Sequence, residues 1–368
     1  MNVILDEKKM NIIIKRSLIV INKSVKELKK IVTLIFIKAG ASKLVASRVA
    51  EHLVGANLVG VDSHGIIRIP LYIEWIKDGT INLNAKMEII KETNLMALID
   101  GHHAFGQVVA DEASNIAINK TKKHGMSLVS VRNSSHIGRL GEYAEKIAKN
   151  DLVCVIMANA QGAGQLVAPW GGKQRRLSAN PIAWGIPTGQ KRRPFILDIS
   201  TSIVAEGKII LYKNLNKNIP EGWVIDFQGK STTNPNDLYG PPEGSILPMA
   251  GHKGFGLSMV VDILAGALSG GGCSRESVKK FYNCFTIISI DPAQICSYDN
   301  FIESVNQLIE YVKSSTPIKE GGEILIPNEL ENRNREQRLL NGIEIEEDIW
   351  NMILVVAKEF GVNLSEND

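Results

Sequence analysis

The stretch from Leu128 to Met157 decides the fold, and it reads LVSVRNSSHIGRLGEYAEKIAKNDLVCVIM. Its first four residues, 128–131, form an apolar run that is typical of a strand. A turn of small residues around His136 follows, and after it come a helical pattern over 139–149 and a second apolar run over 153–157. The stretch therefore predicts a strand, a histidine-bearing turn, a helix and a second strand that is buried.

Two of the seven histidines share this setting of a turn beside small residues. His136 lies in Ser134-Ser135-His136-Ile137-Gly138-Arg139, and His64 lies in Asp62-Ser63-His64-Gly65 with Arg68 shortly after it. Histidine gives or takes a proton near neutral pH, and arginine holds an anion. Together they indicate an enzyme that acts on a small acidic molecule. Taken alone, His64 could instead be a structural residue at a helix entry that forms a hydrogen bond with Asp62. For His136, a structural and a functional role both stay open.

Two further polar residues stand at the ends of apolar segments. Asp198 follows a short apolar strand, where it is either a functional carboxylate or a simple helix N-cap. Lys253 precedes an apolar helix, a place where the helix dipole disfavours a cation unless an anion is bound. The backbone amides of 138–140 also open a helix, and such an end attracts phosphate. We interpret His102 and His103 as solvated turn residues.

Composition describes an ordinary globular protein. The chain has 368 residues, of which 44% are hydrophobic and 22% charged, and a formal net charge of +3. This charge is too small to indicate a nucleic-acid partner. The only dense basic clusters are 173–176 and 191–193. We interpret them as solvated turns, with an anion site as the alternative.

The cysteines and the hydropathy pattern bear on the compartment. Four cysteines occur, Cys154, Cys273, Cys284 and Cys296, and none forms a Cys-x-x-Cys pair. This usage is typical of buried thiols in a reducing compartment rather than of disulfides or a zinc site. No apolar run reaches the ~18 residues that a membrane span needs, and no signal peptide is recognisable. We therefore expect a cytoplasmic protein without a membrane partner.

The chain lacks the fingerprint of the usual dinucleotide-binding fold. The stretch 162–167, GAGQLV, has no third glycine, and Pro169 and its neighbours interrupt any helix after it. A dinucleotide, if bound, therefore needs a different fold.

A set of motifs in a fixed order points to one known family. They are GVDSHG at 60–65, FGQ at 105–107, SHIGR at 135–139, APWGG at 168–172, NPIA at 180–183, DISTS at 198–202, GK at 207–208, IPEGW at 219–223, TTNP at 232–235 and HKGFG at 252–256. Over about residues 23–360 the chain resembles the malate/L-lactate dehydrogenase family. This family is unrelated to the Rossmann lactate and malate dehydrogenases, and it includes ureidoglycolate, sulfolactate and hydroxycarboxylate dehydrogenases and Δ1-piperideine-2-carboxylate reductase.

The resemblance implies a fold and an organisation. The fold is a non-Rossmann α/β fold around a large, mainly antiparallel or mixed sheet, with helices from both termini packed together. Residues 23–100 plus 299–368 are expected to form a mainly helical lobe, and 101–298 a cofactor-binding and catalytic α/β lobe. Residues 1–22 have no family counterpart and are an extension of unknown role. The family usually forms homodimers.

The resemblance also implies the chemistry, which is hydride transfer between NAD or NADP and a small 2-hydroxy or 2-keto acid. His136 matches the proton donor or acceptor, His64 a residue at the nicotinamide and the catalytic centre, and Arg68 a residue at the substrate carboxylate. Asp198 is a further catalytic candidate. The residues expected to line the cofactor are His64, Gly138, Arg139, Leu140, Asp198, Ile199, Ser200, Lys253, Asn328, Glu329, Leu330 and Glu331.

Some alternatives stay open at this point. Ala179 stands where family members often have threonine, and its missing hydroxyl leaves room for a non-catalytic, ligand-binding relative. A metal-dependent hydrolase using His64, His136 and Asp198 is a second alternative, although no metal-ligand spacing supports it and no metal is expected. The loop 159–162 varies across the family, so the substrate and the choice between NAD and NADP are not carried over.

Overall fold

The chain folds into two units. The computed structural model describes residues 20–276, 278 and 280–362. The first unit contains the described residues up to Glu74 and from Arg333 onward, and the second unit spans Trp75–Asn332. Of the extension expected over 1–22, residues 1–19 lie outside the described part of the chain, and 20–22 belong to a strand.

The first unit is mainly helical and joins the two ends of the described chain. Its elements are β1 (Val20–Lys23), α2 (Val25–Lys38), α3 (Lys43–Leu58), two short 3-10 turns (Asp62–His64 and Ile66–Arg68), most of α4 (Ile69–Lys77), most of α10 (Glu329–Asn341), β12 (Ile343–Glu346) and α11 (Glu347–Glu359). Strands β1 and β12 pair antiparallel. Ser24 and Glu27 form the capping box that begins α2. The expected packing of both termini together is confirmed.

The second unit is built on a seven-stranded sheet. Its strands are β2 (Glu88–Glu92), β3 (Met96–Asp100), β4 (Met126–Ser134), β5 (Val153–Asn159), β6 (Ile182–Ile186), β7 (Phe195–Ile199) and β11 (Asn283–Ile290). Their order is β2-β3-β4-β11-β5-β6-β7. Only β3 and β4 pair in parallel, and the other neighbours are antiparallel. The sheet is therefore mixed, as expected, and it is not a Rossmann sheet.

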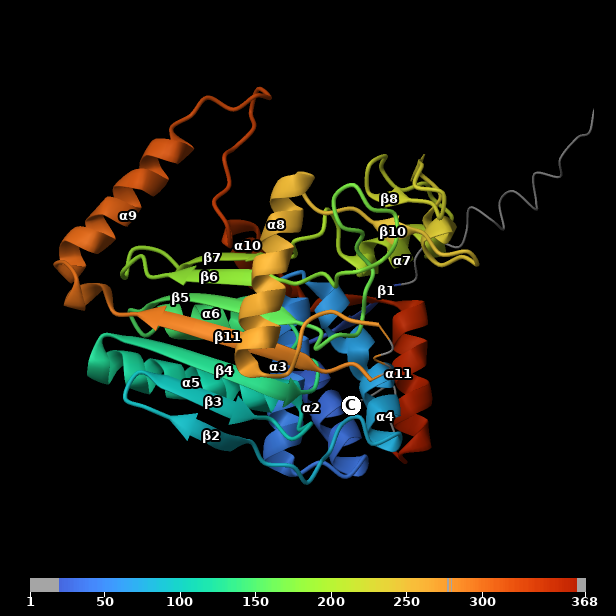
Figure 1. Ribbon diagram of the computed structural model, residues 1–368. Helices are drawn as coiled ribbons and strands as arrows, with labels where there is room; N and C mark the ends of the chain where they lie inside the picture. The colour runs from blue at the N-terminus through green and yellow to red at the C-terminus, as the bar shows by residue number, and fades with distance from the viewer. Residues whose placement is uncertain (1–19, 277, 279, 363–368) are drawn as a thin grey trace, which may run out of the picture. The chain divides into compact units, whose positions relative to one another are not determined.

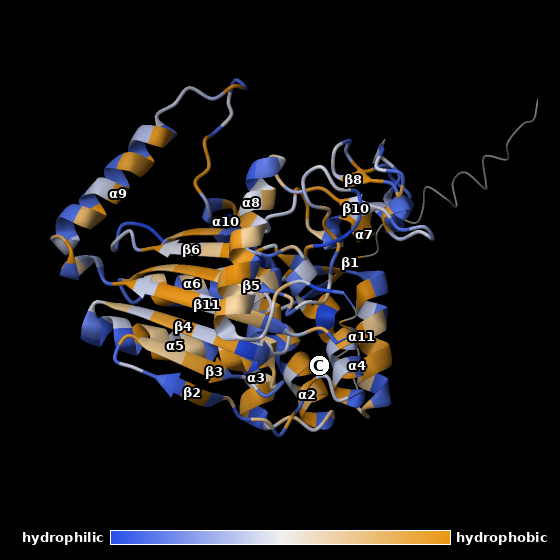
Figure 2. Cartoon of the chain, in the orientation of Figure 1, coloured by the Kyte–Doolittle hydropathy of each residue, from blue (hydrophilic) through white to orange (hydrophobic). Residues whose placement is uncertain are grey.

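Helices cover both faces of this sheet. Helices α5 (Gly106–His124) and α6 (Leu140–Ala148) pack on one face, and α8 (His252–Asp262) with a π-helical turn (Ile263–Ala267) packs on the other (Figure 1). The central strands are largely apolar, whereas the edge strand β2 is hydrophilic at its visible end (Figure 2). The apolar core between the sheet and α5 and α6 includes Ile137 and Leu140, which follow His136 in the chain.

Two parts of the second unit were not predicted from sequence. They are helix α7 (Glu206–Asn214) and a three-stranded sheet of β8 (Val224–Ile225), β9 (Ser231–Thr232) and β10 (Ser245–Ile246). They enclose a small apolar core of their own. The helical pattern near 299–313 corresponds to α9 (Tyr298–Lys313).

The unit boundaries differ from the lobes expected from sequence. Strands β2 and β3 belong to the second unit because β3 pairs with β4 inside the large sheet. Helix α9 also belongs to the second unit, where Asn306 Nδ2 donates to the carbonyl of Thr188 at 3.1 Å. Residues 75–100 and 299–332 thus lie with the α/β part of the chain.

The four cysteines are free thiols with different exposure. Cys154 and Cys284 are buried, Cys273 is half-buried and Cys296 is exposed. Burial raises the pKa of Cys154 to about 12 and that of Cys284 to about 11. The expectation of buried thiols therefore holds for these two and fails for Cys296, which lies in an exposed turn before α9.

Candidate active site

The turn that carries His136 is held at three points. The amide of Gly106 donates to Ser135 Oγ at 2.8 Å, and the amide of Ile137 donates to Asn283 Oδ1 at 3.0 Å. The hydroxyl of Tyr143 donates to the carbonyl of Ile137 at 2.6 Å. All three contacts involve the residues on either side of His136. The backbone at His136 is therefore placed independently of its own side chain.

The imidazole of His136 faces an aromatic column. Its ring centroid lies 5.9 Å from that of Phe281, and Phe281 stacks on Trp75 at 5.8 Å with an interplanar angle of 13°. A Cβ at Gly164 would lie 2.9 Å from the Phe281 ring, so the chain passes close to this column. An apolar ring beside a proton carrier limits the positions that the imidazole can adopt.

Asp198 caps a helix, but a different one from that expected. Its Oδ2 accepts from the amide of Gly141 at 2.7 Å, at the start of α6. Helix α7, which follows Asp198 in the chain, begins only after Ala205. A Cβ at Gly141 would lie 2.5 Å from Arg139 Nη1 and 3.0 Å from Asp198 Oδ2, so both groups crowd this helix end. A carboxylate thus takes the amide directly after 138–140, the donors that the sequence offered to a phosphate.

Lys253 lies where the sequence placed it, in the first turn of α8, and it is exposed. The turn before it is sharp, with φ values of 47° at Ala250 and 62° at Gly251. The amide of Met249 donates to the carbonyl of Thr201 at 3.0 Å. This bond ties the Lys253 loop to the loop that follows Asp198. Within the second unit, the three segments expected to line the cofactor are therefore linked in sequence: the His136 turn to Asp198, and the Asp198 loop to Lys253.

His64 and Arg68 belong to the first unit. Ser63 Oγ lies 3.0 Å from His64 Nδ1, and Arg68 Nε donates to the carbonyl of Ser63 at 2.7 Å. Asp62 is engaged elsewhere, with Arg338 Nη1 at 2.8 Å and Asn57 Nδ2 at 2.6 Å. Ser63, rather than Asp62, is therefore the contact that orients the ring at Nδ1. Arg68 supports the turn through its Nε hydrogen.

The C-terminal candidates 328–331 have mixed settings. Asn328 is buried, with φ of 78°, and its Nδ2 donates to the carbonyl of Pro194 at 3.0 Å. Both carboxylate oxygens of Glu329 accept from Lys313 at 2.6 Å. Leu330 is exposed. Asn328 and Glu329 thus have structural contacts of their own, which the sequence did not reveal.

The basic clusters agree with the interpretation as turns. Arg175 donates to the carbonyl of Gly244 at 2.8 Å and pairs with Glu243 at 3.1 Å. Arg192 pairs with Glu310 on α9. Each cluster thus has an arginine that stabilises the local fold.

Several residues of the site were not singled out from sequence. Asn283 and Tyr143 hold the His136 turn, and Phe281 lies against its ring. Gly106 stands in a motif that the sequence offered, but its role as the neighbour of this turn was not visible. Asn283 is 146 positions from its partner Ile137, so no local pattern could have found it.

His103 differs from its expected place as a solvated turn residue. Its ring stacks on Tyr282 with centroids 4.0 Å apart, and its Nδ1 is buried. Burial lowers the pKa of the His103 imidazole from its usual 6.5, because burial penalises the charged form. His102, in contrast, is exposed and contacts Glu88 at 2.9 Å, which agrees with the expectation.

We expect His103 to make the protein less stable in acid. Because the folded-state pKa lies below that of the unfolded chain, the unfolded state binds more protons in the window beneath 6.5. The stability is therefore fully present above that value and falls as the pH decreases into this window. His103→Asn tolerates the positive φ and removes the titration. Unfolding midpoints measured from about pH 7 to 5 should fall less steeply in the variant. Equal slopes in both proteins would show that His103 does not contribute.

Two further features of the described residues concern metal binding and membrane insertion. No three His, Cys, Asp or Glu side chains among residues 20–276, 278 and 280–362 gather as a metal-binding group. In the same part of the chain, no helix is long and apolar enough to cross a membrane.

Comparison with known proteins gives the family. The family model for malate/L-lactate dehydrogenases matches residues 24–354. An L-sulfolactate dehydrogenase of Methanothermobacter thermautotrophicus is 37% identical over 346 residues, which cover 92% of this chain and 96% of that protein. Hydroxycarboxylate dehydrogenase B of Escherichia coli is 35% identical over 333 residues, covering 89% and 91%.

A solved structure agrees with these matches. The malate dehydrogenase of Pyrococcus horikoshii superimposes with a TM-score of 0.83 at 36% identity, and the match covers 94% of this chain and 97% of that one. The three relatives are named for different acids and are similar to this chain at nearly equal identity, so identity does not select the substrate. The chain belongs to the malate/L-lactate dehydrogenase family, and the relatives named here are hydroxy-acid dehydrogenases.

Proposed function

We propose that this protein is an NAD(P)-dependent oxidoreductase that interconverts a small 2-hydroxy acid and its 2-keto acid. The observation that carries the proposal is the His136 turn, which is fixed on both sides of the histidine by Gly106, Asn283 and Tyr143. A proton carrier contributes to catalysis only when it is held within reach of the reacting atom. The turn meets this need through contacts of the residues on either side of the histidine.

We assign the proton transfer to His136. In the reducing direction, the carbonyl carbon of the keto acid gains a hydride, and the carbonyl oxygen takes one proton from the protonated imidazole, which becomes neutral. In the oxidising direction, the imidazole accepts that proton from the hydroxyl. A histidine in this role is worth a factor of about 10² to 10⁴. The apolar Phe281 ring supports this assignment because it restricts the imidazole to few positions.

We assign NAD or NADP to the second unit, where it would contact residues of the three linked segments. These are Gly138, Arg139 and Leu140 in the His136 turn, Ile199 and Ser200 after Asp198, and Lys253 in α8. We also assign cofactor contacts to a fourth segment near the start of α10, with Asn328, Glu329, Leu330 and Glu331. The exposed cation at the start of α8 supports this fit, because a helix dipole disfavours a lysine there unless an anion is present. When bound, the nicotinamide supplies or accepts the hydride.

We propose roles for Asp198, His64 and Arg68 that agree with their contacts. Asp198 accepts a hydrogen bond from Gly141 at the N-terminus of α6. We propose that this contact fixes the position of the His136 turn relative to the loop that follows Asp198. We propose that His64, whose Nδ1 lies 3.0 Å from Ser63 Oγ, acts at the nicotinamide. Arg68 would bind the substrate carboxylate in two-point geometry through its terminal nitrogens.

One assay tests the proposal. The oxidation of NADH and of NADPH is followed by absorbance with a panel of 2-keto acids, with and without a chelator. We expect turnover that is insensitive to the chelator, and the faster of the two reductants identifies the cofactor. Folded protein without turnover on any keto acid would contradict the proposal. Turnover abolished by the chelator would favour a metal-dependent enzyme instead.

Replacing Arg68 with methionine should raise KM for the keto acid strongly and leave NADH affinity nearly unchanged. A hydrogen bond to a charged group is worth about 1.5–3 kcal/mol, which is a factor of roughly 10 to 100 in KM. Steady-state kinetics and a fluorescence titration with NADH measure the two quantities. Equal weakening of NADH binding would place Arg68 at the cofactor. A fall in thermal stability of the variant would instead report the loss of its bond to Ser63.

We further propose that the protein is a homodimer. This proposal rests on the resemblance to the family, and sedimentation of the purified protein measures it directly.

A further inference from the structure

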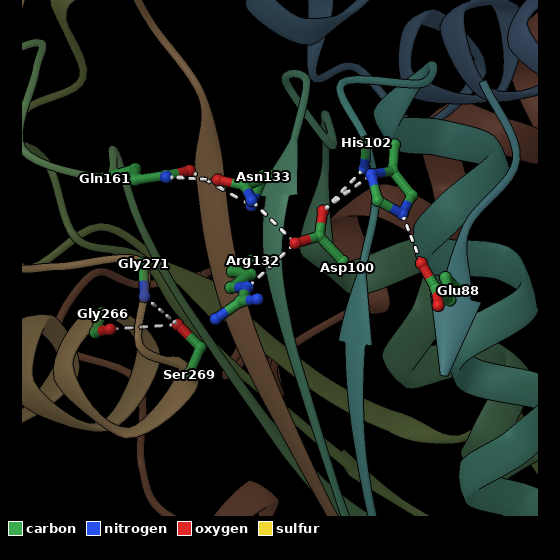
Figure 3. Close-up of polar contacts among 9 residues, drawn as sticks. All are labelled: Glu88, Asp100, His102, Arg132, Asn133, Gln161, Gly266, Ser269 and Gly271. Carbon is green, nitrogen blue, oxygen red and sulfur yellow. Dashed lines mark hydrogen bonds and ion pairs between the residues drawn. The ribbon is translucent and has the colours of Figure 1, made fainter. Parts of the chain in front are cut away.

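Three residues with unusual backbone geometry gather at one edge of the large sheet. His102, Asn133 and Gln161 have φ values of 46°, 53° and 46°. None is glycine, and such a conformation costs on the order of 1–3 kcal/mol at each position unless its surroundings hold it. His102 and Gln161 follow the ends of β3 and β5, and Asn133 lies at the end of β4. Figure 3 shows the three side chains linked through shared contacts. The backbone strain at His102, Asn133 and Gln161 is therefore held by one connected set of side-chain contacts.

The support is the buried carboxylate of Asp100. Its Oδ2 accepts from Arg132 Nε and from Asn133 Nδ2, each at 2.9 Å, and its Oδ1 accepts from the amide of His102 at 2.9 Å (Figure 3). Burial alone would raise the pKa of Asp100, but the three hydrogen bonds outweigh burial and lower it. The carboxylate is thus ionised and fixes two of the strained residues, one after β3 and one at the end of β4.

Asn133 extends this support to the next loop. Gln161 Nε2 donates to Asn133 Oδ1 at 2.6 Å, and the amide of Asn133 donates to Gln161 Oε1 at 3.2 Å (Figure 3). Both ends of the Gln161 carboxamide are therefore used by one residue. We call this two-point contact between Asn133 and Gln161 the amide clasp.

The amide clasp closes a ring of contacts around the His136 turn. The amide of Gln161 donates to Asn159 Oδ1 at 3.2 Å, and the carbonyl of Asn159 accepts from Asn283 Nδ2 at 2.7 Å. Asn283 Oδ1 in turn accepts from the amide of Ile137 at 3.0 Å. Asn159 and Asn283 are buried. The chain from Asn133 to Ile137, which contains His136, is thus spanned at both ends by one hydrogen-bonded path.

We propose that the amide clasp, anchored on Asp100, is a positioning device for His136. Neither Asn133 nor Gln161 need touch the substrate, because they act by fixing where the turn begins. If the clasp opens, the turn keeps its contacts at Ser135 and Ile137 but loses its fixed start, and the imidazole moves out of reach. This inference rests on the proposed role of His136 as the proton carrier.

The test uses two variants that preserve the backbone. Asn133→Gly removes the side chain at a position whose positive φ glycine adopts freely. Gln161→Met keeps the length and the backbone constraint of an unbranched side chain but cannot form the clasp. The matched control is Ser130→Ala, which deletes a buried hydrogen bond between Ser130 on β4 and Thr286 on β11, outside the turn. Thr286 keeps its bond to the carbonyl of Leu264, so the control is mild.

Each clasp variant should lower kcat about 10- to 100-fold, the effect of a misplacement near 1 Å, with KM for the keto acid and for NADH changed less. The double variant should be no slower than the slower single variant, because either change opens the clasp. Ser130→Ala should keep kcat. A kcat within about twofold of the parent in both clasp variants, or losses that simply add in the double variant, would overturn the proposal.

A second measurement does not depend on turnover. Amide hydrogen exchange at residues 134–138 should quicken about tenfold in both clasp variants and stay unchanged in Ser130→Ala, since one hydrogen bond of ordinary net strength corresponds to about that factor. Unchanged exchange in the clasp variants would overturn the proposal even if activity is lost. If the parent protein itself turns over no keto acid, the proposed function fails, and hydrogen exchange alone then decides whether the clasp holds the turn.

Discussion

Replacing His136 with asparagine should lower kcat by a factor on the order of 10² to 10⁴ and leave the fold and NADH binding nearly unchanged. An amide fills much of the imidazole volume and keeps one hydrogen bond, but it cannot exchange a proton near neutral pH. The turn should persist because Gly106, Asn283 and Tyr143 hold its backbone and not the ring. Steady-state kinetics, thermal unfolding and NADH titration measure the three properties separately.

His64→Asn is the companion variant. His64 is oriented by Ser63, and we place it on the nicotinamide side, so its loss should act more through binding than through kcat. A His136→Asn protein with near-normal kcat, together with an inactive His64→Asn protein, would show that the two roles are exchanged.

Replacing Gly106 with alanine should damage both stability and activity. A Cβ at this position would overlap the carbonyl oxygens of Ser135 and His136 and would stand 2.6 Å from the carbonyl carbon of His136. These are backbone atoms, so no side chain can move aside, and overpacking of this kind costs about 1–3 kcal/mol. The turn must shift instead, and we expect kcat to fall by about 10²-fold.

Gly256→Ala is the matched control for stability. Gly256 also lies in a helix, but a Cβ there meets open space. Alanine should therefore stabilise the protein by roughly 0.5–1 kcal/mol. Denaturant unfolding compares the two variants. If Gly106→Ala unfolds like the parent and retains its kcat, the close contact with the His136 turn is not needed for either property.

Local sequence patterns predicted most of the helices and strands. The capping box of Ser24 and Glu27 begins α2, and Gly125, with φ of 86°, ends α5 as expected. These signals succeed because the residues involved lie within one or two turns of each other. Helix α7 has no such signal, since its N-cap Ala205 makes no side-chain hydrogen bond, and it was not predicted.

The apolar run over 254–268 predicts one helix, and the structure differs from this prediction in helix type. Helix α8 ends at Asp262, and a π-helical turn continues it over Ile263–Ala267. The apolar pattern marks the buried face in both forms, because it does not distinguish one hydrogen-bond spacing from the other. The sequence therefore predicted the extent of this segment but not its geometry.

The candidate site depends on contacts that sequence patterns do not contain. Asp198 reaches Gly141 across 57 positions, and Asn283 reaches Ile137 across 146. Asn283 meets the His136 turn because β11 lies beside β4, and Asp198 meets Gly141 because α6 packs against β7. The residue types and motifs could be read from sequence, whereas the partners that orient them follow only from the order of the strands.

Direct transfer of the hydride is the central claim, and isotope labelling tests it most directly. The protein is supplied with reduced nicotinamide cofactor that carries deuterium at the transferable position and with the keto acid that it turns over fastest. The account predicts that mass spectrometry finds one deuterium on the carbinol carbon of the hydroxy acid product. A product without deuterium, with the label lost to water or retained on the cofactor, would contradict it.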